Sequence, residues 1–300
     1  MDWKGKTAFI TGGVSGIGFG IARAFCAGQI DLILTYRNAA YREQAERWFA
    51  DNDRPTPRFV MLDVTDRRRW AELAEQLGPV HILVNNAGIS VFGPTDEASY
   101  ADYDWIMGVN FGGVVNSLVT FIPRIKAHGQ GGHIVNVASM AAYLPGPQAG
   151  IYTASKFAVR GLTESLRFNL APHGIGVSLM CPGLTKTNAW DSALKRPATF
   201  AASGFAPPDP AALRQFGVAF DVGMDPLEVG EKTLAGIQES RPVIFTHPEF
   251  DEDFTEIYRE CVAALPHEPV PQGRLSIEQL RREANRAAAA GKLIGLGDLT

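Results

Sequence analysis

Short apolar runs rich in β-branched residues recur along most of the chain, and longer stretches with helical spacing separate them. Each run is too short for a helix, and its nearly continuous hydrophobicity is typical of a strand that is buried on both faces of a sheet. The pattern predicts seven strands, at residues 7–10, 32–35, 59–62, 82–84, 133–137, 177–180 and 243–245.

The stretches between these strands repeat apolar residues at the spacing of an amphipathic helix. They predict helices at residues 17–27, 40–50, 67–77, 103–125 and 151–170. Because strands that alternate with helices form a parallel sheet covered on both faces, the predicted fold class is α/β. We expect a Rossmann-like, doubly wound parallel sheet of about seven strands, built by a single domain over residues 1–250 with a C-terminal extension over residues 251–300.

Two segments break this alternation. Residues 187–225 combine four prolines with five aromatic residues, which suits either a mobile lid or an irregular packed insertion, and we interpret them as a substrate-covering element. In the extension, Ser276 and Gln279 match a capping box, which predicts a helix that opens there and runs through an alanine string to Gly291. The extension could cover an active site, extend an interface or pack on its own subunit.

Composition and charge exclude several classes of protein. The chain is 46% hydrophobic and 20% charged, and its net charge of −4 argues against binding to nucleic acid or an anionic membrane. Cys26, Cys181 and Cys261 are widely separated, so neither a disulfide framework nor a metal site is indicated. No apolar leader begins the chain and no stretch approaches the length of a membrane span, so we expect a cytoplasmic protein.

A glycine-rich turn follows the first predicted strand and leads into the first helix. Its sequence, T-G-G-V-S-G-I-G, contains Gly12, Gly16 and Gly18, with Ser15 and Ile17 between them. Glycine lets backbone approach a phosphate closely, and the free N–H groups of a helix N-terminus favour an anion. A glycine-rich turn at this place between strand and helix predicts a dinucleotide site.

Tyr152 and Lys156 combine a proton donor with a cation. On a helix, residues four apart lie on one face, so the phenol and the ammonium point into the same space. A phenol with a pKa near ~10 transfers protons poorly at neutral pH, and a nearby cation lowers that pKa. The alternative is a half-buried tyrosine beside a solvated lysine, because this spacing is common by chance.

The order and spacing of six motifs resemble those of the short-chain dehydrogenase/reductase family, over about residues 5–250. The turn has the spacing G-x-x-x-G-x-G. The other motifs are Asp63-Val64, Asn85-Asn86-Ala87-Gly88, Asn110, Ser139 with the Tyr152/Lys156 pair, and Pro182-Gly183-Leu184-Thr185-Lys186-Thr187. The resemblance implies an oxidoreductase that binds a nicotinamide dinucleotide.

The resemblance assigns roles to four catalytic residues. Tyr152 is the general acid in carbonyl reduction and the general base in alcohol oxidation, and Lys156 binds the nicotinamide ribose and lowers the tyrosine pKa. Ser139 hydrogen-bonds the substrate oxygen and stabilises the charge that develops there. Asn110 holds a water that relays protons to the lysine, although a purely structural role for it remains the alternative.

The same resemblance places the cofactor. It implies that Asp63, with Val64 beside it, hydrogen-bonds the adenine. It also implies that Thr187 and Thr185 hold the nicotinamide carboxamide, next to Pro182 and Gly183. Asn86, Ala87 and Gly88 let backbone pass near the ribose, whereas Asn85 is interpreted as a structural tie between strands.

The choice between NADP and NAD depends on the end of the second strand. An NAD enzyme normally carries a carboxylate there for the ribose 2′-hydroxyl, but this chain has Tyr36 followed by Arg37, and an arginine can bind a 2′-phosphate. We therefore expect NADP. NAD is the alternative, since Ser15 lacks the basic neighbour that many NADP-binding members carry, and Arg37 can be a merely exposed strand-end residue.

The residues expected around the reacting carbon are largely apolar, which favours a bulky apolar or aromatic alcohol or ketone. They are Phe92, Ser139, Met140, Tyr143, Leu144, Tyr152 and Trp190, with Ser90 and Val91 nearby. The segments G-I-G-F-G, V-N-F-G-G-V-V-N and F-T-H-P-E-F are similar to those of bacterial dehydrogenases of bulky secondary alcohols, including enzymes that oxidise the benzylic alcohol of lignin-derived aryl ethers.

The central hypothesis is NADP-coupled interconversion of a secondary alcohol and a ketone. A nucleotide-sensing protein without proton chemistry, and a lyase or epimerase on a related scaffold, are the alternatives. The first would not need Ser139, Tyr152 and Lys156 together, and the second usually carries G-x-x-G-x-x-G. By analogy with the family, we expect a homodimer or homotetramer that pairs through the two long helices at 103–125 and 151–170.

Overall fold

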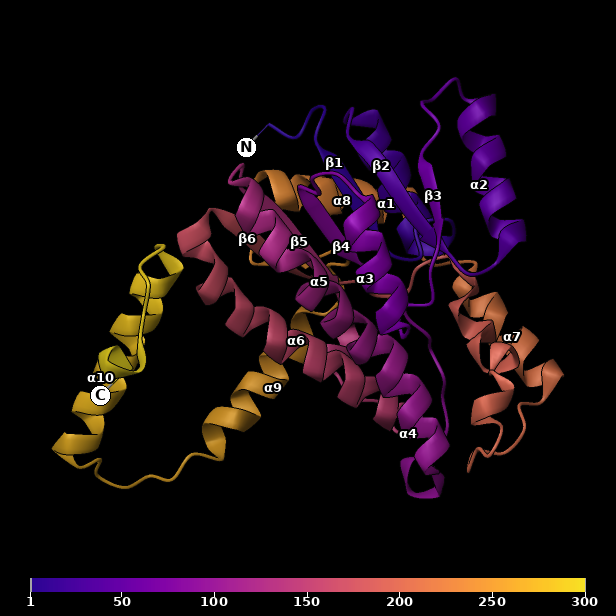
Figure 1. Ribbon diagram of the computed structural model, residues 1–300. Helices are drawn as coiled ribbons and strands as arrows, with labels where there is room; N and C mark the ends of the chain where they lie inside the picture. The colour runs from indigo at the N-terminus through magenta and orange to yellow at the C-terminus, as the bar shows by residue number, and fades with distance from the viewer. Residues whose placement is uncertain (1, 300) are drawn as a thin grey trace.

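Seven parallel strands form one sheet in the order β3-β2-β1-β4-β5-β6-β7 (Figure 1). The computed structural model describes residues 2–299. The strands are β1 (Thr7–Ile10), β2 (Asp31–Tyr36), β3 (Arg58–Met61), β4 (Ile82–Asn85), β5 (Gly132–Val137), β6 (Ile175–Cys181) and β7 (Val243–Phe245). All seven predicted strands are confirmed. The strand order reverses between β1 and β4, and a sheet of this kind binds its ligand outside the carboxyl ends of the strands at such a reversal.

Helices cover both faces of the sheet because successive strand residues point to opposite sides. Ala8 and Ile10 pack with α1 (Gly16–Ala27), α2 (Ala39–Asp51) and α8 (Pro226–Gln238), whereas Phe9 packs with the opposite layer. That layer consists of α3 (Arg67–Gln76), α5 (Gly113–His128) and α6 (Gly150–Leu170). The strands are therefore buried on both faces, as their hydrophobicity predicts.

The predicted helix at residues 103–125 is a longer, interrupted run. It comprises α4 (Tyr100–Met107), a π-helical segment at Gly108–Gly112, and α5. By length and composition the run could cross a membrane, so the expectation that no stretch approaches that length is wrong. Half of its most apolar window is buried inside the protein, where α5 packs on the sheet.

Residues 187–225 are more regular than their proline content suggests. They contain 3₁₀ segments at Asn188–Lys195 and Ala198–Phe200, followed by the helix α7 (Pro210–Phe220). Asp102 of α4, which is fully buried, anchors them: Arg196 Nη2 lies 2.7 Å from its Oδ1, Ser203 Oγ donates to Oδ1 at 2.7 Å and the Gly204 N–H donates to Oδ2 at 2.9 Å. Burial alone would raise the pKa of Asp102, but hydrogen bonds from Ser99, Ser203 and Gly204 hold it well below its usual range.

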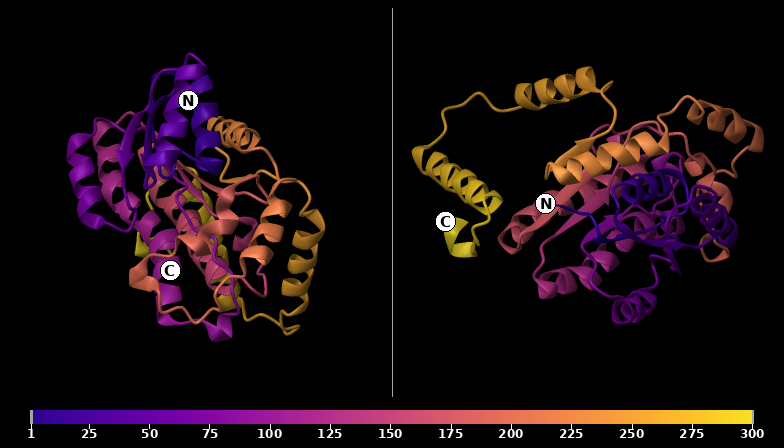
Figure 2. Two further views of the ribbon diagram at one scale, coloured as in Figure 1. Left: turned by 90° about the vertical axis from the view of Figure 1, so that its right-hand side faces the viewer. Right: turned by 90° about the horizontal axis from the view of Figure 1, so that it is seen from above.

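The C-terminal extension consists of α9 (Asp251–Ala263) and α10 (Gln272–Ala289), which stand away from the sheet (Figures 1 and 2). The predicted capping box is wrong. Helix α10 already begins at Gln272, and Ser276 Oγ donates to the Gln272 carbonyl from inside the helix. The predicted end is confirmed, because Gly291 has φ +87°, the left-handed conformation that ends helices.

Two glycines let α1 and α8 pack backbone against backbone. A Cβ on Gly20 would overlap the carbonyl of Pro226, and one on Gly230 would overlap the carbonyl of Gly20. Since neither backbone can move without displacing a helix of the core, these positions are specified by packing.

Gly20→Ala should therefore destabilise the protein by about 1–3 kcal/mol or more, as overpacking does. The matched control is Gly161→Ala in α6, where a Cβ meets nothing within 4 Å. There the gain in helix propensity should stabilise by about 0.5–1 kcal/mol. Urea unfolding followed by circular dichroism measures both changes, and equal midpoints for the two variants would contradict this packing.

Candidate active site

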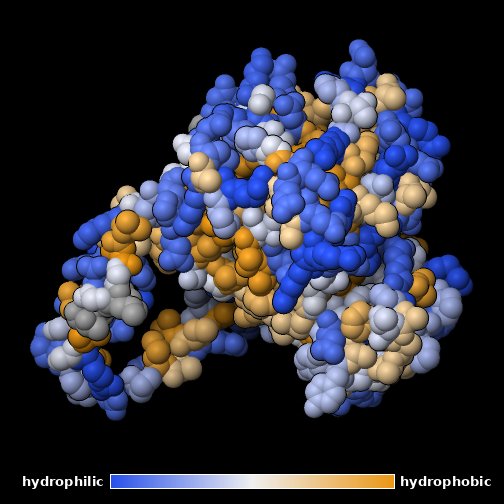
Figure 3. Space-filling view, in the orientation of Figure 1, coloured by the Kyte–Doolittle hydropathy of each residue, from blue (hydrophilic) through white to orange (hydrophobic). Residues whose placement is uncertain are grey.

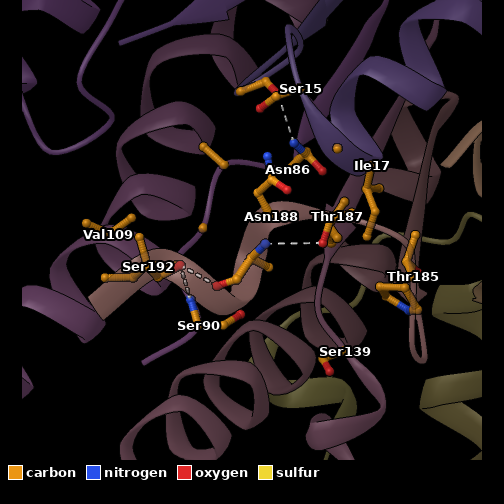
Figure 4. Close-up of a pocket in the computed structure, with 18 of the residues that line it drawn as sticks. Ser15, Ile17, Asn86, Ser90, Val109, Ser139, Thr185, Thr187, Asn188 and Ser192 are labelled. Atoms are coloured by element: carbon orange, nitrogen blue, oxygen red, sulfur yellow. Dashed lines mark hydrogen bonds between the residues drawn. The ribbon is translucent and has the colours of Figure 1, made fainter. Parts of the chain in front are cut away.

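A cavity of about 610 Å³ opens where the strand order reverses. The loops that follow β1 to β6 line it together with the segment after Thr187, and Figure 4 shows Ser15 and Ser139 at opposite ends. The predicted cofactor residues that line it are Gly12, Ser15, Gly16, Ile17, Tyr36, Arg37, Asp63, Val64, Asn86, Ala87, Gly88, Tyr152, Lys156, Pro182, Gly183, Thr185 and Thr187. The sheet thus brings together residues that lie far apart in the sequence.

The glycine turn provides a backbone cradle at one end of the cavity. Gly12 and Gly16 have φ values of 62° and 51°, which glycine adopts without strain. Ser15 caps α1 without a side-chain hydrogen bond, so the first N–H groups of the helix remain available to an anion. Gly18 does not line the cavity; a Cβ there would overlap the Gly12 carbonyl, so its role is packing.

The Asn85–Gly88 turn is tied to the glycine turn and to the sheet. Thr11 Oγ1 accepts hydrogen bonds of 2.9 Å from the N–H groups of Asn86 and Ala87, and Asn86 Nδ2 donates to the Thr11 carbonyl at 2.9 Å. Asn85 Nδ2 donates to Asn136 Oδ1 at 2.7 Å, which joins β4 to β5. Asn85 is therefore a tie between strands, as interpreted from the sequence.

Arg37 and Asp63 meet at the end of the cavity formed by β2 and β3. Arg37 Nη1 lies 3.2 Å from Asp63 Oδ2, and both side chains are nearly half exposed. Asp63 also accepts hydrogen bonds from the N–H and the hydroxyl of Thr65. Burial would raise the pKa of Asp63, but the hydrogen bonds from Thr65 and Arg37 bring it below its ordinary value. The arginine is therefore held over the cavity by the carboxylate.

Two residues at this end, Tyr41 and Lys195, were not predicted. Both line the cavity, and Lys195 Nζ lies 5.7 Å from the centroid of the Tyr41 ring while it pairs with Asp191. Lys195 lies eight residues after Thr187 in the proline-rich segment. The segment was interpreted from its prolines and aromatic residues, and no role was therefore assigned to Lys195.

Tyr152 and Lys156 of α6 meet Ser139, which follows β5, at the other end. Lys156 Nζ lies 5.6 Å from the centroid of the Tyr152 ring and donates to the Val137 carbonyl at 3.1 Å. Ser139 and Ser90 lie close enough to the phenol for their side chains to lower its pKa. A phenol, an ammonium and two hydroxyls thus converge on one point of the cavity.

Burial dominates the protonation of this group. It lowers the pKa of Lys156 to about 8 and raises the pKa of Tyr152, against the opposing effect of hydrogen bonds from Ser139 and Ser90. The pKa of Tyr152 is therefore raised overall by its surroundings, and the lowering effect of Lys156 on it stays a prediction. Desolvation of the phenolate outweighs an ammonium that is itself desolvated.

Asn110 lies in the π-helical segment, is buried and does not line the cavity. Its Oδ1 accepts from the Ile89 N–H at 2.8 Å, and its Nδ2 donates to the Ile89 carbonyl at 3.0 Å and to Ser155 Oγ at 3.1 Å. The side chain therefore braces the loop after β4 against α6. A Cβ on Gly88 would meet Asn110 Oδ1 at 3.2 Å and Lys156 Nζ at 3.6 Å, so the loop passes close above both.

His247 fixes the turn that follows β6, and the sequence assigned it no role. Its Nδ1 accepts from the Gly183 N–H at 3.0 Å, and its Nε2 lies 2.8 Å from the Leu184 carbonyl. Because an N–H can only donate, Nδ1 is the acceptor and Nε2 carries the proton. The signal in the sequence was the F-T-H-P-E-F segment, used there only as part of a resemblance.

Of the predicted substrate residues, Phe92, Ser139 and Tyr152 line the cavity. The Phe92 ring lies 5.9 Å from Tyr152 and 5.6 Å from Phe216 of α7. Ser90, Ser192 and Phe220 line it as well. Ser192 Oγ accepts from the Ser90 N–H at 3.1 Å and donates to the Ala189 carbonyl, which closes the segment onto the loop after β4 (Figure 4).

Four predicted substrate residues, Met140, Tyr143, Leu144 and Trp190, lie outside the cavity lining. Met140 is buried, and its N–H donates to the Pro182 carbonyl. Tyr143 lies under the Arg160 guanidinium and meets the Phe254 ring edge-on, Leu144 packs against the hydrophobic core, and Trp190 covers Gly217 of α7. Sequence proximity to Ser139 and Thr187 did not reveal which way these side chains point.

Comparison with known proteins gives the family. A profile of the short chain dehydrogenases matches residues 6–197. The chain is 33% identical to a C alpha-dehydrogenase of Sphingobium sp. strain SYK-6, covering 97% of this chain and 98% of that protein. It is 34% identical to an NADP-dependent (R)-specific alcohol dehydrogenase of Lentilactobacillus kefiri over 61% of this chain and 75% of the other.

A solved structure agrees with these relatives. A short chain dehydrogenase/reductase from Burkholderia phymatum in complex with NAD superposes with a TM-score of 0.80, at 31% identity, over 90% of this chain and 99% of that one. Family profile, sequence relatives and structure thus agree with the geometry of the cavity. The chain belongs to the short-chain dehydrogenase/reductase family and is an oxidoreductase that acts on CH–OH groups with a nicotinamide dinucleotide.

Proposed function

We propose that the protein interconverts a bulky apolar or aromatic secondary alcohol and its ketone with NADP. The observation that carries this proposal is the convergence of Ser139, Tyr152 and Lys156 at the end of a cavity whose other end is the glycine cradle at the N-terminus of α1. The features of the cavity suit a dinucleotide that lies between these two ends. Glycine leaves the backbone at the wall of the cavity free of side chains, and the free N–H groups at the start of α1 can bind a pyrophosphate.

The reaction needs a hydride and a proton. When bound, the reduced nicotinamide supplies the hydride. In the direction of reduction, the Tyr152 hydroxyl donates a proton to the carbonyl oxygen, while the Ser139 hydroxyl hydrogen-bonds that oxygen and stabilises its developing charge. Lys156, held by the Val137 carbonyl, lends positive charge to the phenolate that forms. In oxidation the same groups act in reverse.

Arg37 supports the preference for NADP. It lies at the rim of the cavity, where it pairs with Asp63, and a guanidinium suits a phosphate better than a hydroxyl. Lys195 lines the same end and adds a second cation. No carboxylate ends β2, where Tyr36 stands. An NADP-dependent relative and a structure with NAD both occur in the family, so NAD is the competing choice.

The substrate end favours a bulky apolar molecule. Phe92, Val109 and Phe220 line the cavity, and Phe216 packs on Phe92. The relative that covers nearly the whole chain is named a C alpha-dehydrogenase, and that name fits oxidation of an alcohol at a substituted carbon.

Tyr152→Phe should lower kcat by at least about 10²–10⁴-fold, the usual contribution of a general acid, because it removes the proton and little else. The dissociation constant of NADPH, measured by fluorescence titration, should change less than about threefold. Tyr143→Phe is the matched control, since that phenol packs outside the cavity and should leave kcat nearly unchanged. A Tyr152→Phe variant with wild-type turnover on every ketone of an aliphatic and aromatic panel would exclude the mechanism.

The rate of ketone reduction should fall as the pH rises through about 8. Burial lowers the pKa of Lys156 to about 8, so the lysine is cationic below that pH and loses its charge above it. Burial raises the pKa of Tyr152, so the phenol stays protonated through this range and does not cause the fall. The profile is measured as kcat/KM for the ketone, from initial rates with NADPH between pH 6 and 10. A flat profile to pH 10 would show that the lysine charge is not needed.

Arg37→Ala should lower kcat/KM for NADP about tenfold or more and leave the value for NAD nearly unchanged, because a hydrogen bond to a charged group contributes about 1.5–3 kcal/mol. Arg42→Ala is the control, since Arg42 pairs with Glu46 on α2 and does not line the cavity. If the wild-type enzyme prefers NAD and Arg37→Ala does not alter the ratio, the cofactor assignment is wrong.

A further inference from the structure

The C-terminal arm, which we define as residues 251–291, is attached to the body at its two ends only. At its start, the Phe254 ring lies 5.1 Å from Tyr143 and 5.2 Å from Phe245. At its end, Ala284 and Ala288 are buried, and Gly291 lies beside Ala171 below the end of α6. The middle of the arm stands away from the body, as all views show (Figures 1 and 2).

Helix α9 carries an apolar stripe that continues past its contact with the body. Its members recur at helical spacing on one face: Phe254, Ile257, Tyr258, Cys261, Val262 and Leu265. The first two are partly buried, but Tyr258, Val262 and Leu265 are 61%, 63% and 61% exposed. Figure 3 shows hydrophobic side chains of this arm facing the hollow between arm and body. Within the described chain, the outer half of the stripe has nothing to pack on.

Helix α10 repeats this arrangement in the opposite direction. Its stripe runs through Ile277, Leu280, Ala284 and Ala288, and only the last two are buried, whereas Ile277 and Leu280 are 50% and 41% exposed. Each helix of the arm thus buries the half of its stripe nearest the body and exposes the other half. A soluble helix normally buries the whole of such a stripe.

The loop between the helices prevents them from covering each other. It contains Pro266, Pro269 and Pro271 within six residues, and prolines hold a connection extended and stiff. The two helices lie apart in every view. The partner for the exposed halves must therefore come from outside this arm.

The charges of the two helices indicate which partner. Helix α9 is acidic, with Asp251, Glu252, Asp253, Glu256 and Glu260 against Arg259. Helix α10 is basic, with Arg274, Arg281, Arg282 and Arg286 against Glu278 and Glu283. An arm with one acidic and one basic helix is complementary to another copy of itself when the two are related by a two-fold axis, because each residue pair then occurs twice.

We propose that the arm binds the arm of a second copy of this chain, with α9 of each copy against α10 of the other. The exposed apolar halves of the two stripes meet in the centre, and the opposite charges lie around them. The interface is self-complementary and closes at two copies through this surface. It does not depend on the proposed reaction, since no residue of the arm lines the cavity.

Two charge variants test the pairing. Glu256→Lys/Glu260→Lys removes the net negative charge of α9 while α10 stays basic, and Arg274→Glu/Arg282→Glu makes both helices acidic. These side chains are exposed, so neither variant should unfold the protein, and circular dichroism checks this. By sedimentation equilibrium, each variant alone should have half the mass of the wild-type assembly, and an equimolar mixture should recover it.

The control is Arg47→Glu/Arg68→Glu, which changes the net charge as the Arg274→Glu/Arg282→Glu variant does, but at exposed positions of α2 and α3, and should leave the mass unchanged. A wild-type protein that is monomeric at 100 µM, or variants that keep the full mass, would overturn the proposal. The proposal would also be overturned if each charge variant alone has a lower mass and the equimolar mixture does not recover the wild-type mass. In that case the arm binds a different surface, and the opposite charge on the other variant's arm does not restore binding.

Discussion

A buried ammonium is the constraint around which the site is built. Lys156 is 5% exposed, and its Nζ donates to the Val137 carbonyl at the end of β5. Taking this charge out of water is unfavourable, as its lowered pKa shows. The surrounding backbone is adapted to it: the loop at Gly88 passes above without a side chain, and Asn110 holds that loop against the same helix. A π-helical interruption in a long helix directs Asn110 there, which is a common use of such interruptions.

A second buried charge sets the opposite wall. Asp102 gathers Arg196, Ser203 and Gly204, so the segment after Thr187 is held by α4 as well as by its aromatic residues. Arg196 also lies 4.6 Å from the Trp105 ring, which places a cation between a carboxylate and an aromatic face. The two buried charges thus have different functions: one is left with few partners and is available for chemistry, and the other is fully bonded and rigidifies the segment that closes the cavity.

The sequence predicted the sheet because strands buried on both faces must be apolar at nearly every position, and it predicted the cavity lining wherever a residue follows a strand directly. Gly12, Asp63, Asn86, Ser139 and Pro182 all lie within two residues of the end of a strand. It could not predict side-chain direction away from strand ends, so Tyr143 and Trp190 were misplaced. It also missed His247, whose ring hydrogen-bonds to Gly183 and Leu184, 64 and 63 residues earlier in the chain. The sign of the Tyr152 pKa shift depends on burial, which spacing along a helix does not reveal.

The arm and the site share one boundary. Tyr143 follows Ser139 by four residues and is enclosed by the Arg160 guanidinium at 3.8 Å and by Phe254, the first apolar residue of the arm. The same turn is held from the other side, where the Met140 N–H donates to the carbonyl of Pro182. Ser139 therefore lies in a short turn fixed at one side by the cofactor loop and at the other by the base of the arm.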